Sequence, residues 1–117
     1  MEFSKEDFDK LFEIFKVECD EHIQKLNSAL VTLEASPDQT DLIEEIFREA
    51  HSLKGAARMM NFSGIEAISH HLETILGKVK NNEVALSADI NDLILKGLDA
   101  VRKARAAGHR QGQITTQ

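Results

Sequence analysis

A histidine, a lysine and a glycine lie beside the apolar face of one helical segment, residues 50–55 (AHSLKG). The apolar residues of this segment recur at steps of three and four, as on the buried face of an amphipathic helix. At about 100° per residue, His51, Lys54 and Gly55 fall outside the centre of that face. An imidazole that faces solvent from a rigid helix is a candidate nucleophile.

Gly55 lies one turn after His51 and needs a physical reason. Glycine within a helix costs about 1 kcal/mol relative to alanine. A glycine leaves no side chain above the helix surface, so we expect a partner molecule to approach His51 closely on this side.

A second segment, residues 63–80, offers a carboxylate that could face His51. Glu73 and His70 lie on its flank, beside the apolar stripe. The turn at Asn61 is very short, so the two segments should pack as an antiparallel hairpin. His51 lies ten residues before Asn61 and Glu73 twelve after it, and the rise per residue is equal in both helices. We therefore expect the imidazole and the carboxylate to meet.

Such a pair has a chemical use. A carboxylate that accepts a hydrogen bond from one ring nitrogen fixes the tautomer and leaves the other nitrogen as a nucleophile. Lys54 and His70, one turn away, would supply positive charge to an arriving anion. These are the groups that phosphoryl transfer requires.

Start signals and turn residues divide the chain into four helices. Capping boxes are predicted at Ser4 with Asp7 and at Ser63 with Glu66, and Ser87 is a further predicted cap. The expected helices span residues 4–34, 36–60, 63–80 and 87–107. Short connections between long amphipathic helices favour antiparallel neighbours. The predicted fold class is all-α, an up-down antiparallel four-helix bundle.

The apolar stripes predict the core and the extent of the domain. Cys19 and Leu93 lie in the stripes of the first and last helices and should be buried, and His22, close to the stripe, should be partly buried. Residues 108–117 have no apolar periodicity, so we expect one domain over residues 1–107 followed by a disordered tail or linker stub. One bundle core favours a monomer.

Composition excludes several classes of function. A formal net charge of −6 and a pI near 5.3 argue against a nucleic-acid binder, which needs a basic surface. No apolar run approaches 18 residues and the N-terminus is acidic, which predicts no membrane segment, no signal peptide and a cytoplasmic location. A glycine-rich phosphate loop is missing, so ATP must be bound elsewhere.

Three motifs together are similar to those of a known family. They are AHSLKG at residues 50–55, RMMNF at 58–62, and His70-x-Leu72-Glu73. Over about residues 6–104 the chain resembles the histidine phosphotransfer (HPt) domains, and among them the N-terminal P1 domain of CheA-type chemotaxis histidine kinases. At Asn61 the family often has glycine, but asparagine tolerates the left-handed conformation.

The resemblance implies a role for each site residue. His51 would carry the phosphoryl group, Glu73 would orient it, and Lys54, Gly55 and His70 would support it. The resemblance also implies two partners: a histidine kinase catalytic domain, which binds ATP and Mg²⁺, and a response-regulator receiver domain, whose aspartate takes the phosphoryl group. The chain would have no cofactor of its own and would be a fragment of a kinase, not catalytic alone.

Three alternatives remain open. A freestanding HPt phosphorelay intermediate would carry the same motifs. Di-iron bundles use Glu-x-x-His motifs on two helices, whereas here the order is reversed in His70-x-x-Glu73 and occurs once, so no metal ligands are assigned. A purely structural bundle fits the composition but gives Gly55 no purpose.

Overall fold

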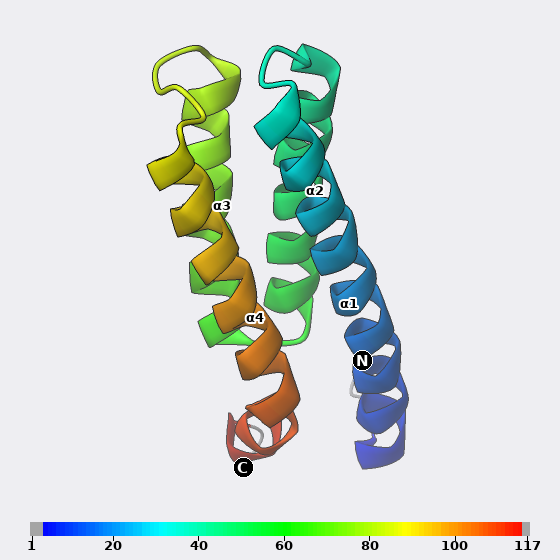
Figure 1. Ribbon diagram of the computed structural model, residues 1–117. Helices are drawn as coiled ribbons and strands as arrows, with labels where there is room; N and C mark the ends of the chain where they lie inside the picture. Colours follow the sequence, from blue (N-terminus) through cyan, green and yellow to red (C-terminus); the bar gives the residue numbers. More distant parts are fainter. Residues whose placement is uncertain (1–3, 116–117) are drawn as a thin grey trace.

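The described part of the chain folds into four helices. The computed structural model describes residues 4–115, with side chains described for residues 4–107. The helices are α1 (Lys5–Ala35), α2 (Thr40–Met59), α3 (Ser63–Lys80) and α4 (Ala88–Thr115). Each helix runs antiparallel to the one before it, with loops at alternate ends (Figure 1). This confirms the predicted up-down four-helix bundle.

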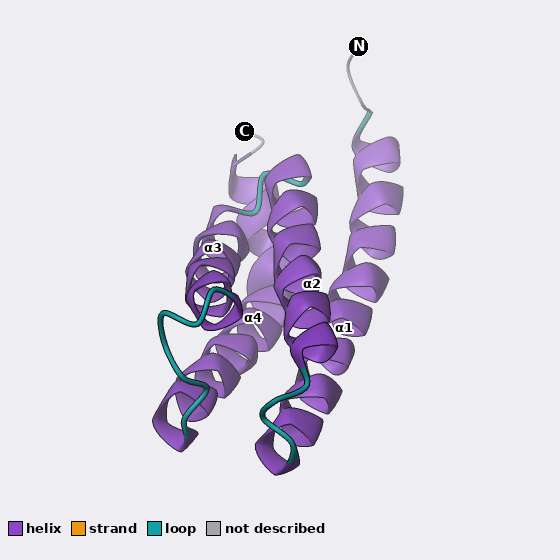
Figure 2. Ribbon diagram, turned by 90° about the horizontal axis from the view of Figure 1, so that it is seen from above, coloured by secondary structure: helices purple, strands orange, loops and turns teal. Residues whose placement is uncertain are grey.

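Each helix packs against two neighbours. Helix α1 lies beside α2 and α4, and α3 lies beside the same two helices, so α1 is diagonal to α3 and α2 to α4 (Figure 2). Within the described part of the chain, no helix is both long and apolar enough to span a membrane.

Two of the predicted caps are present. The Ser4 hydroxyl oxygen accepts a hydrogen bond from the Asp7 backbone N–H (3.0 Å), and the Asp7 carboxylate accepts one from the Ser4 N–H (3.3 Å). The Ser87 hydroxyl oxygen accepts a hydrogen bond from the N–H of Ile90 at the start of α4. Asn61 has a φ of 59°, the left-handed conformation that ends α2.

One predicted helix start and one predicted capping box are wrong, whereas the predicted span of α3, residues 63–80, is confirmed. Ser36 does not open α2, because its backbone N–H donates to the carbonyl of Thr32 and so caps the end of α1. Helix α2 begins only at Thr40. Ser63 is already helical and makes no capping hydrogen bond. The carboxylate of Glu66 does not complete a capping box but pairs with Arg58 of α2.

The last helix is longer than the sequence pattern predicts. Helix α4 continues to Thr115, whereas the loss of apolar periodicity predicts an end near Ala107. Apolar periodicity indicates which residues pack against a core. A segment that lacks this periodicity can still be helical if it contains no proline. The division into a domain (1–107) and a tail (108–117) stays a prediction, and residues 116–117 lie outside the described part of the chain.

The core consists of two clusters, which we call upper and lower. The upper cluster lies toward the loops at residues 36–39 and 81–87, and the lower cluster lies toward the turn at Asn61. The fully buried members of the upper cluster are Leu26, Leu30, Leu33, Ile46, Ala50, Leu76 and Ile94. The lower cluster gathers Phe12, Phe15, Cys19, Ile23, Leu53, Ala57, Phe62, Ile65 and Val101.

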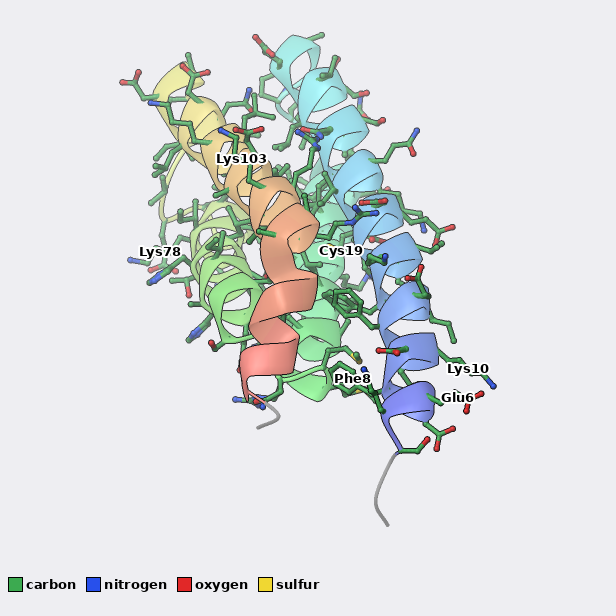
Figure 3. All side chains as sticks on the ribbon, turned by 90° about the horizontal axis from the view of Figure 1, so that it is seen from below. Glu6, Phe8, Lys10, Cys19, Lys78 and Lys103 are labelled. Atoms are coloured by element: carbon green, nitrogen blue, oxygen red, sulfur yellow. The ribbon has the colours of Figure 1, made fainter. Side chains whose placement is uncertain are left out.

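Cys19 and Leu93 test the predicted core. Cys19 is fully buried and lies inside the bundle, whereas Lys10 and Lys78 point outwards (Figure 3). Burial and the neighbouring Asp20 charge raise the pKa of the Cys19 thiol to about 11. Leu93 is 51% exposed, so its predicted burial is wrong. The core side of α4 passes through Ile94 and Leu98, and Leu93 is turned about 100° away from Ile94.

A glycine sets the distance between α3 and α4 in the middle of the bundle. A Cβ atom on Gly97 would lie 2.8 Å from Cδ2 of Leu72, closer than two carbon atoms can approach. Leu72 is buried and directly precedes the candidate site residue Glu73. Because Gly97 has no side chain, Leu72 can pack against α4 and hold this part of α3 in place.

We predict that Gly97→Ala destabilises the domain. Overpacking costs about 1–3 kcal/mol, which exceeds the roughly 1 kcal/mol that alanine gains over glycine in a helix. Gly55→Ala is the matched control, because nothing lies within 4 Å of its added Cβ, and it should stabilise by up to about 1 kcal/mol. Urea unfolding measures both. Stabilisation by both substitutions would contradict this packing argument.

Candidate functional site

The α2–α3 hairpin brings His51 and Glu73 into contact. The Nδ1 atom of His51 is hydrogen-bonded to Oε2 of Glu73. The His51 side chain is 63% exposed, whereas the Glu73 side chain is only 13% exposed. The contact expected from the register of the hairpin is therefore confirmed, and the carboxylate lies beneath the imidazole.

Lys54 provides a second hydrogen-bond donor to this carboxylate. Its Nζ donates to Oε1 of Glu73 over 2.6 Å, so each carboxylate oxygen has its own donor. Burial alone would raise the pKa of the Glu73 carboxyl, but hydrogen bonds and positive charge from Lys54 and His51 outweigh it and hold the pKa below its usual value. Glu73 is therefore ionised at neutral pH.

This geometry determines which nitrogen of His51 can react. A carboxylate accepts hydrogen bonds, so Nδ1 is the protonated ring nitrogen. In the neutral ring, Nε2 then carries the lone pair, at the far side of the imidazole from Glu73. An oriented, exposed nucleophilic nitrogen with a cation one turn away can attack an electrophile such as a phosphorus atom.

The surface beside His51 is open. Gly55 is exposed, and nothing lies within 4 Å of the position that a Cβ atom would take. Ser52 is exposed as well, and Met59 is 87% exposed. Small exposed residues therefore lie beside His51, and the exposed Met59 follows about two turns farther along α2.

The structure does not bring His70 into this arrangement. Its ring lies 6.3 Å from that of His71, and within the described part of the chain it makes no hydrogen bond to His51 or Glu73. Both histidines are exposed on α3. The supporting role expected of His70 stays a prediction.

A second histidine–glutamate pair was missed from the sequence. Nδ1 of His22 on α1 lies 2.6 Å from Oε1 of Glu49 on α2, and both side chains are less than one-fifth exposed (18% and 17%). The partial burial expected of His22 is confirmed. Counting outward from the α1–α2 loop is a poor guide to this pair, because His22 lies 13 residues before Ala35, the end of α1, whereas Glu49 lies nine residues after Thr40, the start of α2.

A metal site would need several ligating side chains close together. Among the described residues, no group of three or more histidine, cysteine, aspartate or glutamate side chains is placed to hold a metal ion. The carboxylate of Glu73, which a metal site would need, is taken up by His51 and Lys54.

We predict that Glu73→Gln reduces the acid sensitivity of the fold. The pKa of Glu73 is lower in the folded state than the unfolded value of about 4.3. Its carboxylate therefore stabilises the domain above that pH, and this stabilisation is lost as the pH falls through the folded-state pKa.

Urea unfolding at a series of pH values from about 6 to 3 tests this. The parent should lose more stability than Glu73→Gln over this range. Glu44→Gln is the control, because the Glu44 side chain on α2 is 53% exposed and lies 3.9 Å from Arg48, and it should behave like the parent. Parallel curves for the parent and Glu73→Gln would show that this carboxylate does not govern acid unfolding.

Comparison with known proteins gives one family. The family model described as "Hpt domain" matches residues 10–104. The chemotaxis protein CheA of Listeria monocytogenes is 37% identical over 84 residues, which cover 72% of this chain but only 14% of that protein. The chain thus spans about one-seventh of the length of this relative.

Solved structures agree with that match. The CheA phosphotransferase domain from Thermotoga maritima superposes with a TM-score of 0.82 at 36% identity, over 90% of this chain and 97% of that domain. The phosphorylated P1 domain of CheA3 in complex with CheY6 from R. sphaeroides shares the fold, with a TM-score of 0.76 at 22% identity, over 85% of this chain and 80% of that one. The chain therefore belongs to the Hpt domain family, among the phosphotransfer domains of CheA.

Proposed function

We propose that His51 accepts a phosphoryl group on Nε2 and later donates it to an aspartate. The proposal is carried by one observation: the Nδ1 atom of His51 is held by the partly buried carboxylate of Glu73, while the side chain of His51 is 63% exposed. Membership of the Hpt domain family supports it.

The chemistry of the first step follows from the geometry. The Nε2 lone pair attacks the γ-phosphorus of ATP, the bond from that phosphorus to the bridging oxygen breaks, and the electron pair leaves with ADP. The ring keeps its Nδ1 proton and becomes positively charged. Glu73 stabilises this charge, because its carboxylate already accepts the Nδ1 hydrogen bond.

The second step reverses the roles. A carboxylate oxygen of the acceptor aspartate attacks the phosphorus, the P–Nε2 bond breaks, and the electron pair returns to the imidazole of His51. Lys54, hydrogen-bonded to Glu73, keeps the orienting carboxylate ionised and in place in both steps. Neither step needs a cofactor within the domain.

Two partners belong to this proposal. A histidine kinase catalytic domain binds ATP and Mg²⁺ and presents the γ-phosphate, and a response-regulator receiver domain carries the aspartate. The similarity to CheA of Listeria monocytogenes supports a place within a longer chemotaxis kinase. Within the same fold, the phosphorylated P1 domain of CheA3 is bound to CheY6. A cytoplasmic location follows, since both partners and ATP act there.

We predict that His51→Gln abolishes labelling by a competent kinase core with radiolabelled ATP. Glutamine keeps the helix and much of the bulk but has no nucleophilic ring nitrogen. His22→Gln is the matched control and should label normally, because the His22–Glu49 pair is largely buried. The domain alone with Mg-ATP should stay unlabelled. Label on His51→Gln would show that another residue is the acceptor.

We predict that Gly55→Leu folds normally but transfers phosphate poorly in both directions. The Cβ atom of the leucine would have no neighbour within 4 Å, but the side chain would stand over the approach to His51. Displacing a reacting partner by about 1 Å can cost about 10²-fold in rate. Circular dichroism checks the fold. Labelling by a kinase core measures transfer to His51, and loss of label from His51 to a receiver domain measures transfer onward. Gly55→Ala should transfer normally. Unimpaired transfer in Gly55→Leu would place the partners on another side of His51.

A further inference from the structure

The helix that carries His51 has three lysine and arginine side chains. They are Arg48, Lys54 and Arg58 of α2, a helix that the structure describes in full. A phosphoryl group on Nε2 of His51 is an anion and is stabilised by positive charge close by. The sequence predicts Lys54 and His70 for this role, but among the described side chains His70 makes no hydrogen bond to the site.

Lys54 and Arg58 are already bound to carboxylates of α3. Nζ of Lys54 donates to Oε1 of Glu73 over 2.6 Å, and Nε of Arg58 donates to Oε2 of Glu66 over 2.9 Å. Both cations are therefore held on the side of α2 that faces α3, where the carboxylates offset their charge.

Arg48 is held much more loosely. Its side chain is 68% exposed, and its ion-pair partner among the described side chains is Glu44, one turn earlier on the same helix, at 3.9 Å. An exposed ion pair contributes little to stability. The guanidinium group can therefore leave Glu44 for a stronger anion at little cost.

Arg48 also lies on the side of α2 toward which the reactive nitrogen of His51 points. Nδ1 of His51 is bonded to Glu73 of α3, so Nε2 lies on the side of the ring away from α3. Lys54, which contacts the same carboxylate, is turned about 60° around the helix from His51. Arg48 is turned about 60° in the opposite direction, away from α3.

The distance along the helix is also suitable. Arg48 and His51 are three residues apart, and the Cβ atoms of such neighbours lie about 5–6 Å from each other. The long arginine side chain can span this distance. An anion bound to Nε2 would thus lie within reach of the guanidinium group.

We propose that Arg48 binds the phosphoryl group as it is transferred to and from Nε2 of His51, and this inference rests on the proposed function of His51. The guanidinium group leaves Glu44 and donates two N–H hydrogen bonds to phosphoryl oxygens, an arrangement that its planar fork matches. It offsets the negative charge of these oxygens both in the transition state and in the phosphorylated domain.

A pH titration of the phosphorylated domain by ³¹P NMR tests for this contact. A neighbouring cation favours the doubly ionised phosphoryl group and lowers its pKa. Arg48→Gln should therefore raise the pKa of the phosphoryl group relative to the parent, and Arg48→Lys, which keeps the charge but not the fork, should lie between them. Glutamine favours the helix and the position is exposed, so both variants should fold, which urea unfolding checks.

Arg58→Gln is the matched control. It removes the same charge from the same helix, and the Arg58 side chain is also exposed, at 76%. Arg58 lies seven residues after His51, which is about 10 Å along the helix axis, and Glu66 holds it toward α3. The phosphoryl pKa of this variant should stay close to that of the parent. Equal pKa changes in Arg48→Gln and Arg58→Gln would show an effect of overall charge alone and would overturn the proposal.

Labelling rates separate binding of the phosphoryl group from recognition of a kinase. Phosphoramidate, a small phosphoryl donor, can label His51 without any protein docking on α2. Arg48→Gln should slow labelling about tenfold with phosphoramidate as well as with a kinase core and Mg-ATP, since a hydrogen bond to a charged group is worth about this factor. The difference should shrink at high salt.

Two failures can be told apart. A defect confined to the kinase core, with parent-like phosphoramidate labelling and phosphoryl pKa, would assign Arg48 to kinase docking and overturn this inference while His51 remains the acceptor. Labelling of His51→Gln would instead overturn the proposed function itself.

Discussion

The site depends on the neutralisation of one partly buried carboxylate. Removing a carboxylate from water is unfavourable unless hydrogen bonds replace those of the solvent. Glu73, with its side chain 13% exposed, has one oxygen bonded to His51 and the other to Lys54. Because both donors lie on α2 and the acceptor lies on α3, any slip between the helices would leave a partly buried charge unpaired. The side chains of His51, Lys54 and Glu73 thus form the candidate site and also fix the register of the α2–α3 hairpin.

Burial distinguishes this pair from its chemical duplicate. His22 and Glu49 repeat the imidazole–carboxylate contact on the opposite flank of α2, but both side chains are largely buried. A partner could not reach the second nitrogen of His22 without opening the α1–α2 interface. The exposed imidazole, more than the pairing itself, makes His51 the candidate for reaction, and the pair at His22 links α1 to α2.

The sequence contains the register of the hairpin but not the details of its packing. Asn61 marks a tight turn, and counting outward from it along two equal helices is enough to pair His51 with Glu73. Hydrogen-bond signals at helix ends are less decisive, because several partners compete for each group: Glu66 pairs with Arg58 and does not cap α3. The close fit of Leu72 against Gly97 depends on how near two helices approach, which periodicity does not specify.

The turn at Asn61 has a consequence for how the site forms during folding. His51 and Glu73 are separated by only 22 positions, and closing so short a loop costs little chain entropy compared with contacts that span the whole domain. Contacts between α1 and α4, by contrast, join distant parts of the chain, as between Asp20 and Arg105. Local contacts of the first kind are typical of fast folding. The candidate site is encoded within residues 40–80, while the outer helices supply the apolar surface that keeps this short segment folded.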